Sequence, residues 1–216
     1  MANNYVNFIS DEHLLNCIEN LHKSYLRAKN NVSKKSFYTN KVDTIKLTFD
    51  AKFNDINEDD LIQSEILRQI DKSINNSIGT FHEQILGGIK GFEVGNLSGF
   101  DIKASDDTLF AIFGTSDLSK NISDAIFEKL ANSARVFLKA QFYYVLFDDI
   151  SETNEKWIIG HEEYSVSQKR VFKVSLKEFY TLLAKQDNAL FQLSDVLPNA
   201  ITEYLMSVSF EKTINS

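Results

Sequence analysis

The sequence predicts an α/β fold with a mainly helical N-terminal part, and three patterns lead to this prediction. Apolar residues recur at steps of three and four over residues 61–86, which is typical of a long amphipathic helix. Residues 141–147 form a nearly unbroken apolar run, as expected of a strand buried on both faces. Between them, two short strand patterns and a further helix pattern give the order helix, strand, strand, helix, strand.

The composition favours one folded domain. The chain has 216 residues, of which 43% are hydrophobic and 12% aromatic, so it can bury a sizeable core and is not a disordered chain. It contains one proline, which excludes a proline-rich linker between domains. We therefore expect a single domain over residues 1–216, with residues 1–88 mainly helical, residues 99–175 forming the sheet core and residues 176–207 forming C-terminal helices.

The cysteine content and the N-terminus indicate the cellular compartment. Cys17 is the one cysteine, so no internal disulfide forms, and this fits a reducing environment. Cys17 shares a helical face with Leu14 and Ile18, so we interpret it as a buried core thiol. The N-terminus lacks a signal-peptide pattern, and no stretch approaches the roughly 20 apolar residues of a membrane span. We expect a cytoplasmic protein.

The helical part contains three segments. Ser10 or Asp11 can cap a helix that runs to about Lys29, and residues 42–49 fit either a short helix or a strand. Asn57 opens the long helix. The residues expected to face inward in the first helix are Leu14, Leu15, Ile18, Leu21 and Leu26.

The sheet part follows a glycine-rich stretch, residues 87–95, that we interpret as a loop. We expect strands at 99–104 and 108–113, joined by a tight turn at 105–107, and a helix over 122–139 with its inner face at Ile122, Ile126, Leu130, Val136 and Phe137. Further strands are expected at 141–147, 156–159 and 170–174. Ser175 and Glu178 form a capping box for a helix through Lys185, and a last helix is expected to start near Pro198.

The charge pattern bears on nucleic-acid binding. A net charge of −7 gives the chain no overall attraction to a polyanion, so any DNA contact needs a local basic surface. Two candidates are a polar line on the long helix and a lysine-rich run. The polar line can also be a solvated helix face or a dimer contact, and the lysine-rich run can also be a solvated face. The polar line offers donors for phosphates and base edges, and its residues are Arg68, Lys72, Asn75, Asn76 and His82. The lysine-rich run comprises Lys34, Lys35, Lys41, Lys46 and Lys52.

One residue in the sheet region indicates chemistry. Phosphate-binding glycine loops, paired metal-binding cysteines and the nucleophile elbow are absent, and the four histidines lack zinc-ligand spacing. Asp101 lies mid-strand between Phe100 and Ile102, where a carboxylate needs a cation, a metal or hydrogen-bond donors. Mg²⁺ accompanies such acids at phosphate-ester sites. Alternatively, Asp101 and Lys103 point the same way and pair at a surface edge.

A resemblance makes this chemistry more specific. Residues 64–88 together with Gly99-Phe-Asp-Ile-Lys103 resemble the GGNCC-cutting type II restriction endonucleases of the PD-(D/E)XK superfamily, and residues 177–180, 188–193 and 197–201 resemble the closing helices of that group. The resemblance implies a mixed central sheet flanked by helices and Mg²⁺-dependent phosphodiester hydrolysis in double-stranded DNA. It also implies a homodimer on a near-palindromic site and a cognate DNA methyltransferase encoded nearby.

The family pattern is incomplete in this chain. Asp101 matches the strand Asp that is the first metal ligand of the family. The next strand of the family carries Glu or Asp, any residue, and then Lys, whereas here the acid position holds Ala111 or Ile112 and the lysine position holds Phe113 or Gly114. None of these residues coordinates a metal or supplies charge, so we expect a loss of several kcal/mol of transition-state stabilisation.

Two replacements for the missing groups remain open. Asp101-Ile102-Lys103 can itself serve as the acid and lysine, with Glu83 or Glu93 as the other ligand, or Asp117 and Lys120 can approach from the following loop. We take Asp101, Lys103 and Glu83 as the catalytic candidates, and Asp101 and Glu83 as the metal ligands. An endonuclease, a DNA-binding protein without chemistry and a dimeric scaffold all remain possible functions.

Overall fold

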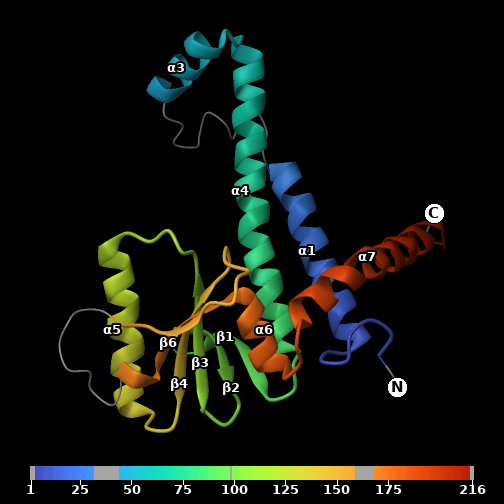
Figure 1. Ribbon diagram of the computed structural model, residues 1–216. Helices are drawn as coiled ribbons and strands as arrows, with labels where there is room; N and C mark the ends of the chain where they lie inside the picture. Colours follow the sequence, from blue (N-terminus) through green and yellow to red (C-terminus); the bar gives the residue numbers. More distant parts are fainter. Residues whose placement is uncertain (1–2, 32–43, 98, 159–167, 215–216) are drawn as a thin grey trace. The chain divides into compact units, whose positions relative to one another are not determined.

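The computed structural model describes residues 3–31, 44–97, 99–158 and 168–214 (Figure 1). Its contacts divide the chain into two compact units. The smaller unit is Cys17–Phe81, and the larger unit comprises Met1–Asn16 and His82–Ser216. Helices α1 (Asp11–Asn31) and α4 (Glu58–Gly87) contribute residues to both units. The single-domain interpretation stays a prediction.

The smaller unit is helical. Besides parts of α1 and α4 it contains α3 (Thr44–Asn54), so the segment that fitted a helix or a strand is a helix. Asn57 caps α4 as predicted, because its Oδ1 accepts a hydrogen bond from the Asp60 backbone N–H at 2.9 Å.

Helix α1 begins where the sequence predicted. The Ser10 Oγ accepts a hydrogen bond from the His13 backbone N–H at 3.1 Å, which identifies Ser10 as the cap. Leu14 and Cys17 are buried, but Leu26 is 47% exposed, so its predicted inward position is wrong. At 3.6 residues per turn, Leu26 lies about 120° around the helix from Leu14 and leaves the buried face.

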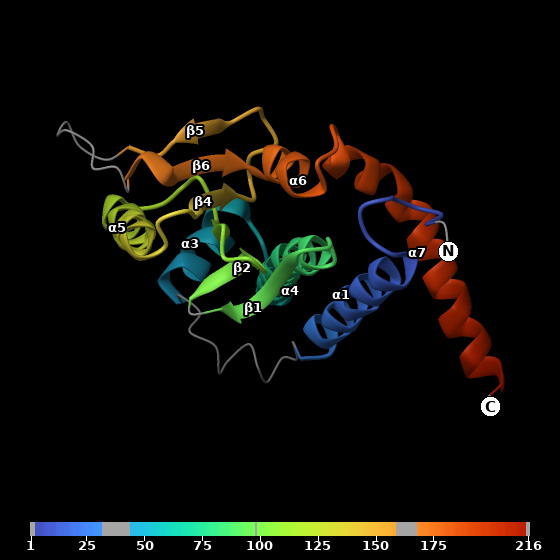
Figure 2. The ribbon, with the colours of Figure 1, turned by 90° about the horizontal axis from the view of Figure 1, so that it is seen from below.

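The larger unit is built on a six-stranded sheet of order β1-β2-β3-β4-β6-β5 (Figure 2). Strand β2 pairs antiparallel with both β1 and β3, strands β3, β4 and β6 run parallel, and β5 pairs antiparallel with β6. The strands are β1 (Phe92–Leu97), β2 (Phe100–Ala104), β3 (Leu109–Gly114), β4 (Gln141–Leu146), β5 (Asn154–Lys156) and β6 (Val171–Ser175). This mixed sheet with flanking helices confirms the predicted α/β fold.

The two faces of the sheet are covered by different helices. Helix α5 (Lys120–Val136) connects β3 to β4, and its buried residues join Phe110 and Phe142 in one core cluster. Helix α6 (Leu176–Ala184) packs on the other face, where the Phe113 ring meets the Phe179 ring edge-on at 5.6 Å. Phe110 and Phe113 point to opposite faces because they are three residues apart on one strand.

Strand β1 corrects the sequence interpretation, which placed its residues in a glycine loop. Phe92 pairs with Ala104 and Val94 with Ile102, and the register shifts before Leu97. Gly95 has a φ of +119°, a conformation that favours glycine, and it lies within this irregular stretch. The glycine therefore marks a bulge in an edge strand, not the end of regular structure.

Helix α5 also differs in detail from the prediction. Ile122 is 52% exposed and Val136 is 74% exposed, so their assignment to the inner face is wrong. The buried positions are Phe127, Leu130, Ala131 and Ala134. Small alanines fill two of the inward sites, and a pattern search for large apolar residues overlooks them.

The C-terminal region contains α6 and α7 (Ala189–Ile214), after the short helix η1 (Gln168–Arg170) and β6. Ser175 caps α6 as predicted, since its Oγ accepts a hydrogen bond from the Glu178 N–H at 3.2 Å. Helix α7 starts at Ala189, so the expected start near Pro198 is wrong, and Pro198 lies inside the helix. None of the helices in the described part of the chain is long and apolar enough to cross a membrane.

Candidate active site

The carboxylate of Asp101 is held at the open end of the β2–β3 hairpin, away from its turn. Asp101 is half-buried, and its Oδ2 accepts a hydrogen bond from the Phe113 backbone N–H at 2.8 Å. This bond joins the side chain on β2 to the carboxyl end of β3, where the parallel part of the sheet also ends. The carboxyl ends of parallel strands are the usual place for ligand sites in α/β folds.

Glu83 lies close enough to Asp101 for the two charges to interact. Burial, followed by the charge of Asp101, raises the pKa of Glu83 from 4.5 to about 7. The ionised form of Glu83 is thus disfavoured, and a bound cation would offset this cost.

Asp101 and Glu83 are both oxygen donors, the type of ligand that Mg²⁺ takes. Mg²⁺ takes hard oxygen ligands, and one or two protein carboxylates suffice when water and phosphate oxygens complete its shell. Among the described residues, no group of three or more His, Cys, Asp or Glu side chains is arranged to hold a metal.

The acid and lysine positions on β3 have apolar surroundings. Ala111 is fully buried opposite Ile102. The Phe113 ring stacks on the Phe147 ring, with 4.9 Å between their centroids, and it also meets Phe179. A packed aromatic cluster thus takes the place where the family pattern has a lysine.

The alternative acid and lysine positions of this motif, residues 112 and 114, are also closely packed. Ile112 is partly buried and packs against the core cluster under α5. A Cβ added at Gly114 would lie 2.1 Å from the hydroxyl oxygen of Tyr144, so no larger side chain fits there without a shift of that tyrosine.

Lys103 makes ion pairs within the hairpin and its neighbouring strand. Its Nζ lies 2.9 Å from a carboxylate oxygen of Asp107 and 3.7 Å from one of Glu93. The hydrogen bond to Asp107 is the main cause that raises the pKa of Lys103. The partners of Lys103 at the strand edge are thus these two acids, in place of the pair with Asp101 that the sequence left open.

The loop after β4 contains a residue that sequence reasoning missed. Asp148 follows β4, and its carboxylate accepts hydrogen bonds from the Ser116 backbone N–H at 2.8 Å and from the Ser116 Oγ at 2.6 Å. It thereby fixes the chain just beyond Gly114. An acid directly after a buried parallel strand was the available signal. Asp117 and Lys120, the alternative replacements, are exposed.

His82 is packed into the larger unit. Its Nδ1 lies 2.9 Å from the Tyr180 hydroxyl, and its ring meets the Tyr180 ring edge-on at 5.8 Å and the Phe147 ring at 6.4 Å. Burial lowers the pKa of His82 from 6.5 to about 4, so the imidazole is neutral at pH 7. These contacts fix the turn of α4 that carries Glu83.

The other four members of the polar line are exposed on α4 in the smaller unit. Arg68, Lys72 and Asn75 follow at spacings of four and three, so they share one face of the helix. Arg68 is held by the buried Glu65 through two hydrogen bonds of 2.6 and 2.5 Å, and this contact lowers the pKa of Glu65. Asn76 is exposed next to this face.

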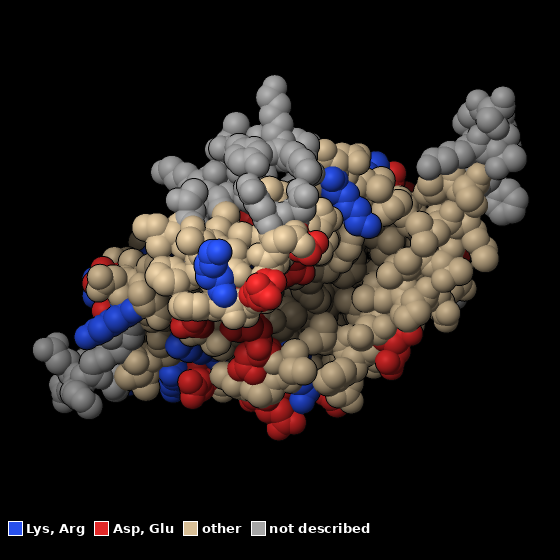
Figure 3. Space-filling model, turned by 90° about the horizontal axis from the view of Figure 1, so that it is seen from above, with Lys and Arg blue, Asp and Glu red and all other residues tan. Residues whose placement is uncertain are grey.

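The lysine-rich run is described only in part. Lys34, Lys35 and Lys41 lie outside the described residues, whereas Lys46 and Lys52 are exposed on α3. On the face shown in Figure 3, the described Lys and Arg side chains stand singly among Asp and Glu and form no continuous basic patch. A DNA contact on that face would depend on individual cations.

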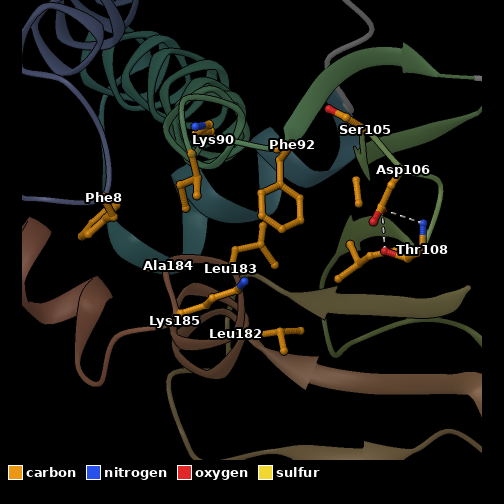
Figure 4. A pocket seen from close by; sticks show the side chains of 14 residues that line it. Phe8, Lys90, Phe92, Ser105, Asp106, Thr108, Leu182, Leu183, Ala184 and Lys185 are labelled. Atoms are coloured by element: carbon orange, nitrogen blue, oxygen red, sulfur yellow. Dashed lines mark hydrogen bonds between the residues drawn. The ribbon is translucent and has the colours of Figure 1, made fainter.

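A groove of about 620 Å³ lies at the opposite end of the hairpin from Asp101. Phe92, Leu183 and Thr108 line it together with Asp106, which accepts two hydrogen bonds from Thr108 (Figure 4). Neither Glu83 nor Asp101 lines this groove. It is therefore separate from the carboxylate pair.

Comparisons with known proteins identify the family of this chain. The profile of the Eco47II restriction endonuclease family matches residues 6–206. The type II restriction enzyme Sau96I of Staphylococcus aureus is 32% identical over 218 residues, covering 95% of this chain and 83% of that enzyme. The type II restriction enzyme Eco47II of Escherichia coli is 26% identical over 214 residues, covering 93% of this chain and 87% of that enzyme. No solved structure gives a significant match. The chain belongs to the Eco47II family of type II restriction endonucleases.

Proposed function

We propose that the protein recognises double-stranded DNA at a GGNCC-type site and hydrolyses a phosphodiester bond there, with one Mg²⁺ held by Asp101 and Glu83. The proposal predicts slow cleavage, because the acid position of β3 holds Ala111 or Ile112 and the lysine position holds Phe113 or Gly114. Membership of the family supports the substrate class.

The observation that supports the metal site is the electrostatic coupling of the two carboxyl groups. The charge of Asp101 contributes to the raised pKa of Glu83, after burial, and this interaction supports a shared cation. When bound, Mg²⁺ would polarise a phosphate oxygen and stabilise the charge that develops on it. Asp101 stays oriented by the Phe113 N–H, and Glu83 is oriented by the turn that His82 anchors.

Hydrolysis requires that a proton leave the attacking water molecule. The raised pKa of Glu83, about 7, belongs to the site without a cation, and a bound cation would keep this carboxylate ionised as a ligand. In hydrolysis the water oxygen forms a bond to phosphorus, the bond to the leaving oxygen breaks, and a proton reaches that oxygen. Lys103 is the proposed replacement for the missing lysine, because it lies two residues from Asp101 on the same strand. A Lys103→Ala variant that cleaves like the parent would remove it from this role.

DNA recognition is proposed for the polar line on α4. Arg68, Lys72, Asn75 and Asn76 are exposed donors on one helix, and such groups bind phosphates and base edges. We also keep His82 in this proposal, although its packing against Tyr180 favours an indirect contribution through the position of α4. Substitution of an exposed member of the line is expected to weaken DNA binding, whereas His82→Ala is expected to act chiefly through stability.

The proposed DNA site also implies an oligomeric state, a partner enzyme and a cellular location. A near-palindromic target implies a twofold homodimer, because each half-site then meets the same surface. A type II enzyme also implies a cognate DNA methyltransferase encoded nearby and a cytoplasmic location, and the single cysteine fits the latter.

A second candidate function is site-specific DNA binding without cleavage. The observation that favours it is the apolar packing of Ala111 and Phe113, which leaves no charge on β3 at the positions that the family uses. Such a protein would occupy the same DNA site.

One experiment separates the two functions. Purified protein is incubated with supercoiled plasmids that contain or lack GGNCC sites, in Mg²⁺, Mn²⁺ or a chelator, and the products are separated on a gel. The proposal expects discrete fragments that need both the site and the cation, and their loss in Glu83→Gln. A salt-sensitive mobility shift on GGNCC duplexes without fragments would support the binding function. The absence of both cutting and a shift would contradict both.

A further inference from the structure

Helix α3 presents an aromatic pair to solvent. Phe49 is 53% exposed and Phe53 is 79% exposed, and their rings contact each other with 5.2 Å between centroids. Ile45 precedes them at the same spacing of four and is 69% exposed. These three residues form one stripe along α3, which we call the α3 stripe. Exposed aromatic pairs of this kind are uncommon in proteins without a partner for them.

Two lysines flank the α3 stripe. At 100° per residue, Lys52 lies about 60° from Phe49 on one side, and Lys46 lies about 60° from it on the other. Both lysines are exposed. Lys46 pairs with Asp50, the one acid of the helix, but an exposed pair four residues apart contributes little and exchanges readily for another anion.

We propose that the α3 stripe is a DNA-contacting surface, in which Phe49 and Phe53 stack on or insert between bases while Lys46 and Lys52 bind the flanking phosphates. The proposal rests on the proposed function and adds to it a contact surface on α3, besides the polar line of α4. Apolar side chains inserted at base steps and aromatic rings stacked on bases are general modes of protein–DNA contact. Neither mode reads a unique base sequence, so this surface would contribute affinity on any duplex.

The charges argue against a second copy of the chain as the partner. A twofold contact between two α3 stripes would bring the flanking lysines of both copies to one interface, where like charges oppose each other. A polyanion next to an apolar surface satisfies both features of the stripe at once.

The test measures the affinity of the full-length protein for fluorescent duplexes, with and without a GGNCC site, by anisotropy at several salt concentrations. The double variant Phe49→Ala/Phe53→Ala is expected to weaken binding to both duplexes at least about tenfold. Lys52→Gln is expected to lower the slope of log affinity against log salt by about one. Circular dichroism verifies that both variants keep their helix content, which is expected because the substituted side chains are exposed.

The matched control is Val136→Ala/Leu138→Ala, which removes two side chains that are 74% and 75% exposed elsewhere in the chain. The control is expected to bind DNA like the parent. Unchanged affinity and salt slope in the α3 variants, with a parent that binds GGNCC duplexes, would overturn this inference alone. A parent that binds no duplex would overturn the proposed function as well. Loss of self-association in the Phe variants, or binding of the parent to anionic vesicles that requires the stripe, would assign the surface to another partner and overturn the inference.

Discussion

Restoring the family's acid and lysine on β3 is expected to raise the rate of DNA cleavage. The change is Ala111→Glu together with Phe113→Lys, which places both groups on one face of the strand because they are two residues apart. The backbone N–H of residue 113 already donates to Asp101 at 2.8 Å, so the new side chains start beside the existing carboxylate. A charged lysine and a third carboxylate ligand are expected to increase single-turnover cleavage at least about 100-fold.

The same change has a predictable cost in stability. Phe113 gives up its stack on Phe147 and its edge contact with Phe179, each worth about 0.5–1.5 kcal/mol beyond the area that it buries. The new Glu at position 111 enters a fully buried site, where an unpaired polar group costs about 1–3 kcal/mol. We therefore expect a loss of roughly 2–6 kcal/mol in the free energy of unfolding in a chelator. Mg²⁺ is expected to recover part of it, because the ion binds the folded state.

The assay is single-turnover cleavage of a short labelled duplex with a central GGNCC site in Mg²⁺, with urea unfolding measured in parallel. The control is Ala111→Gln/Phe113→Met, which has similar shapes without the charges and is expected to cleave like the parent. A charged double variant that is folded and binds the duplex, yet cleaves no faster than the parent, would refute the assignment of these positions.

Three further predictions concern the stability and reactivity of the fold. Burial raises the pKa of Cys17 from 9 to about 12, so at pH 8 its reaction with a thiol reagent is expected to be roughly a thousandfold slower in the folded chain than in denaturant; equal rates would show that the site opens. Ser175→Ala removes the cap on the Glu178 N–H and is expected to destabilise the protein by about 1–2 kcal/mol in urea unfolding, and an unchanged midpoint would contradict this. Gly114→Ala brings a Cβ to 2.1 Å from the Tyr144 hydroxyl and is expected to lower the melting temperature by several degrees, whereas an unchanged value would show that the tyrosine moves freely.

The sequence predicted the elements whose patterns are strong and local. The long helix α4, the hairpin of β2 and β3 and the buried strand β4 follow from apolar periodicity and turn residues. Strand β1 was not predicted from the sequence because Gly91 and Gly95 resemble loop residues. The pairing with β2 nevertheless tolerates them. The start of α7 was misplaced because Pro198 is also compatible with a position inside a helix.

Part of the candidate site was also indicated by local sequence patterns. Asp101 stood out as a carboxylate inside a strand, and Glu83 was named as its partner from the end of the preceding helix. The contact of His82 with Tyr180 joins residues 98 positions apart, and no local pattern indicates such a pair. Nor does periodicity show that Phe113 contacts the rings of Phe147, just after β4, and of Phe179 in α6, because that depends on how the elements pack.

The central claim, that Asp101 and Glu83 hold one divalent cation, is tested most directly by calorimetric titration of the protein with Mg²⁺ and Mn²⁺. We predict binding of one ion by the parent and by Asp117→Asn, an exposed acid in the following loop, and loss of binding in Asp101→Asn and Glu83→Gln. An Asp101→Asn isotherm identical to that of the parent would contradict the claim.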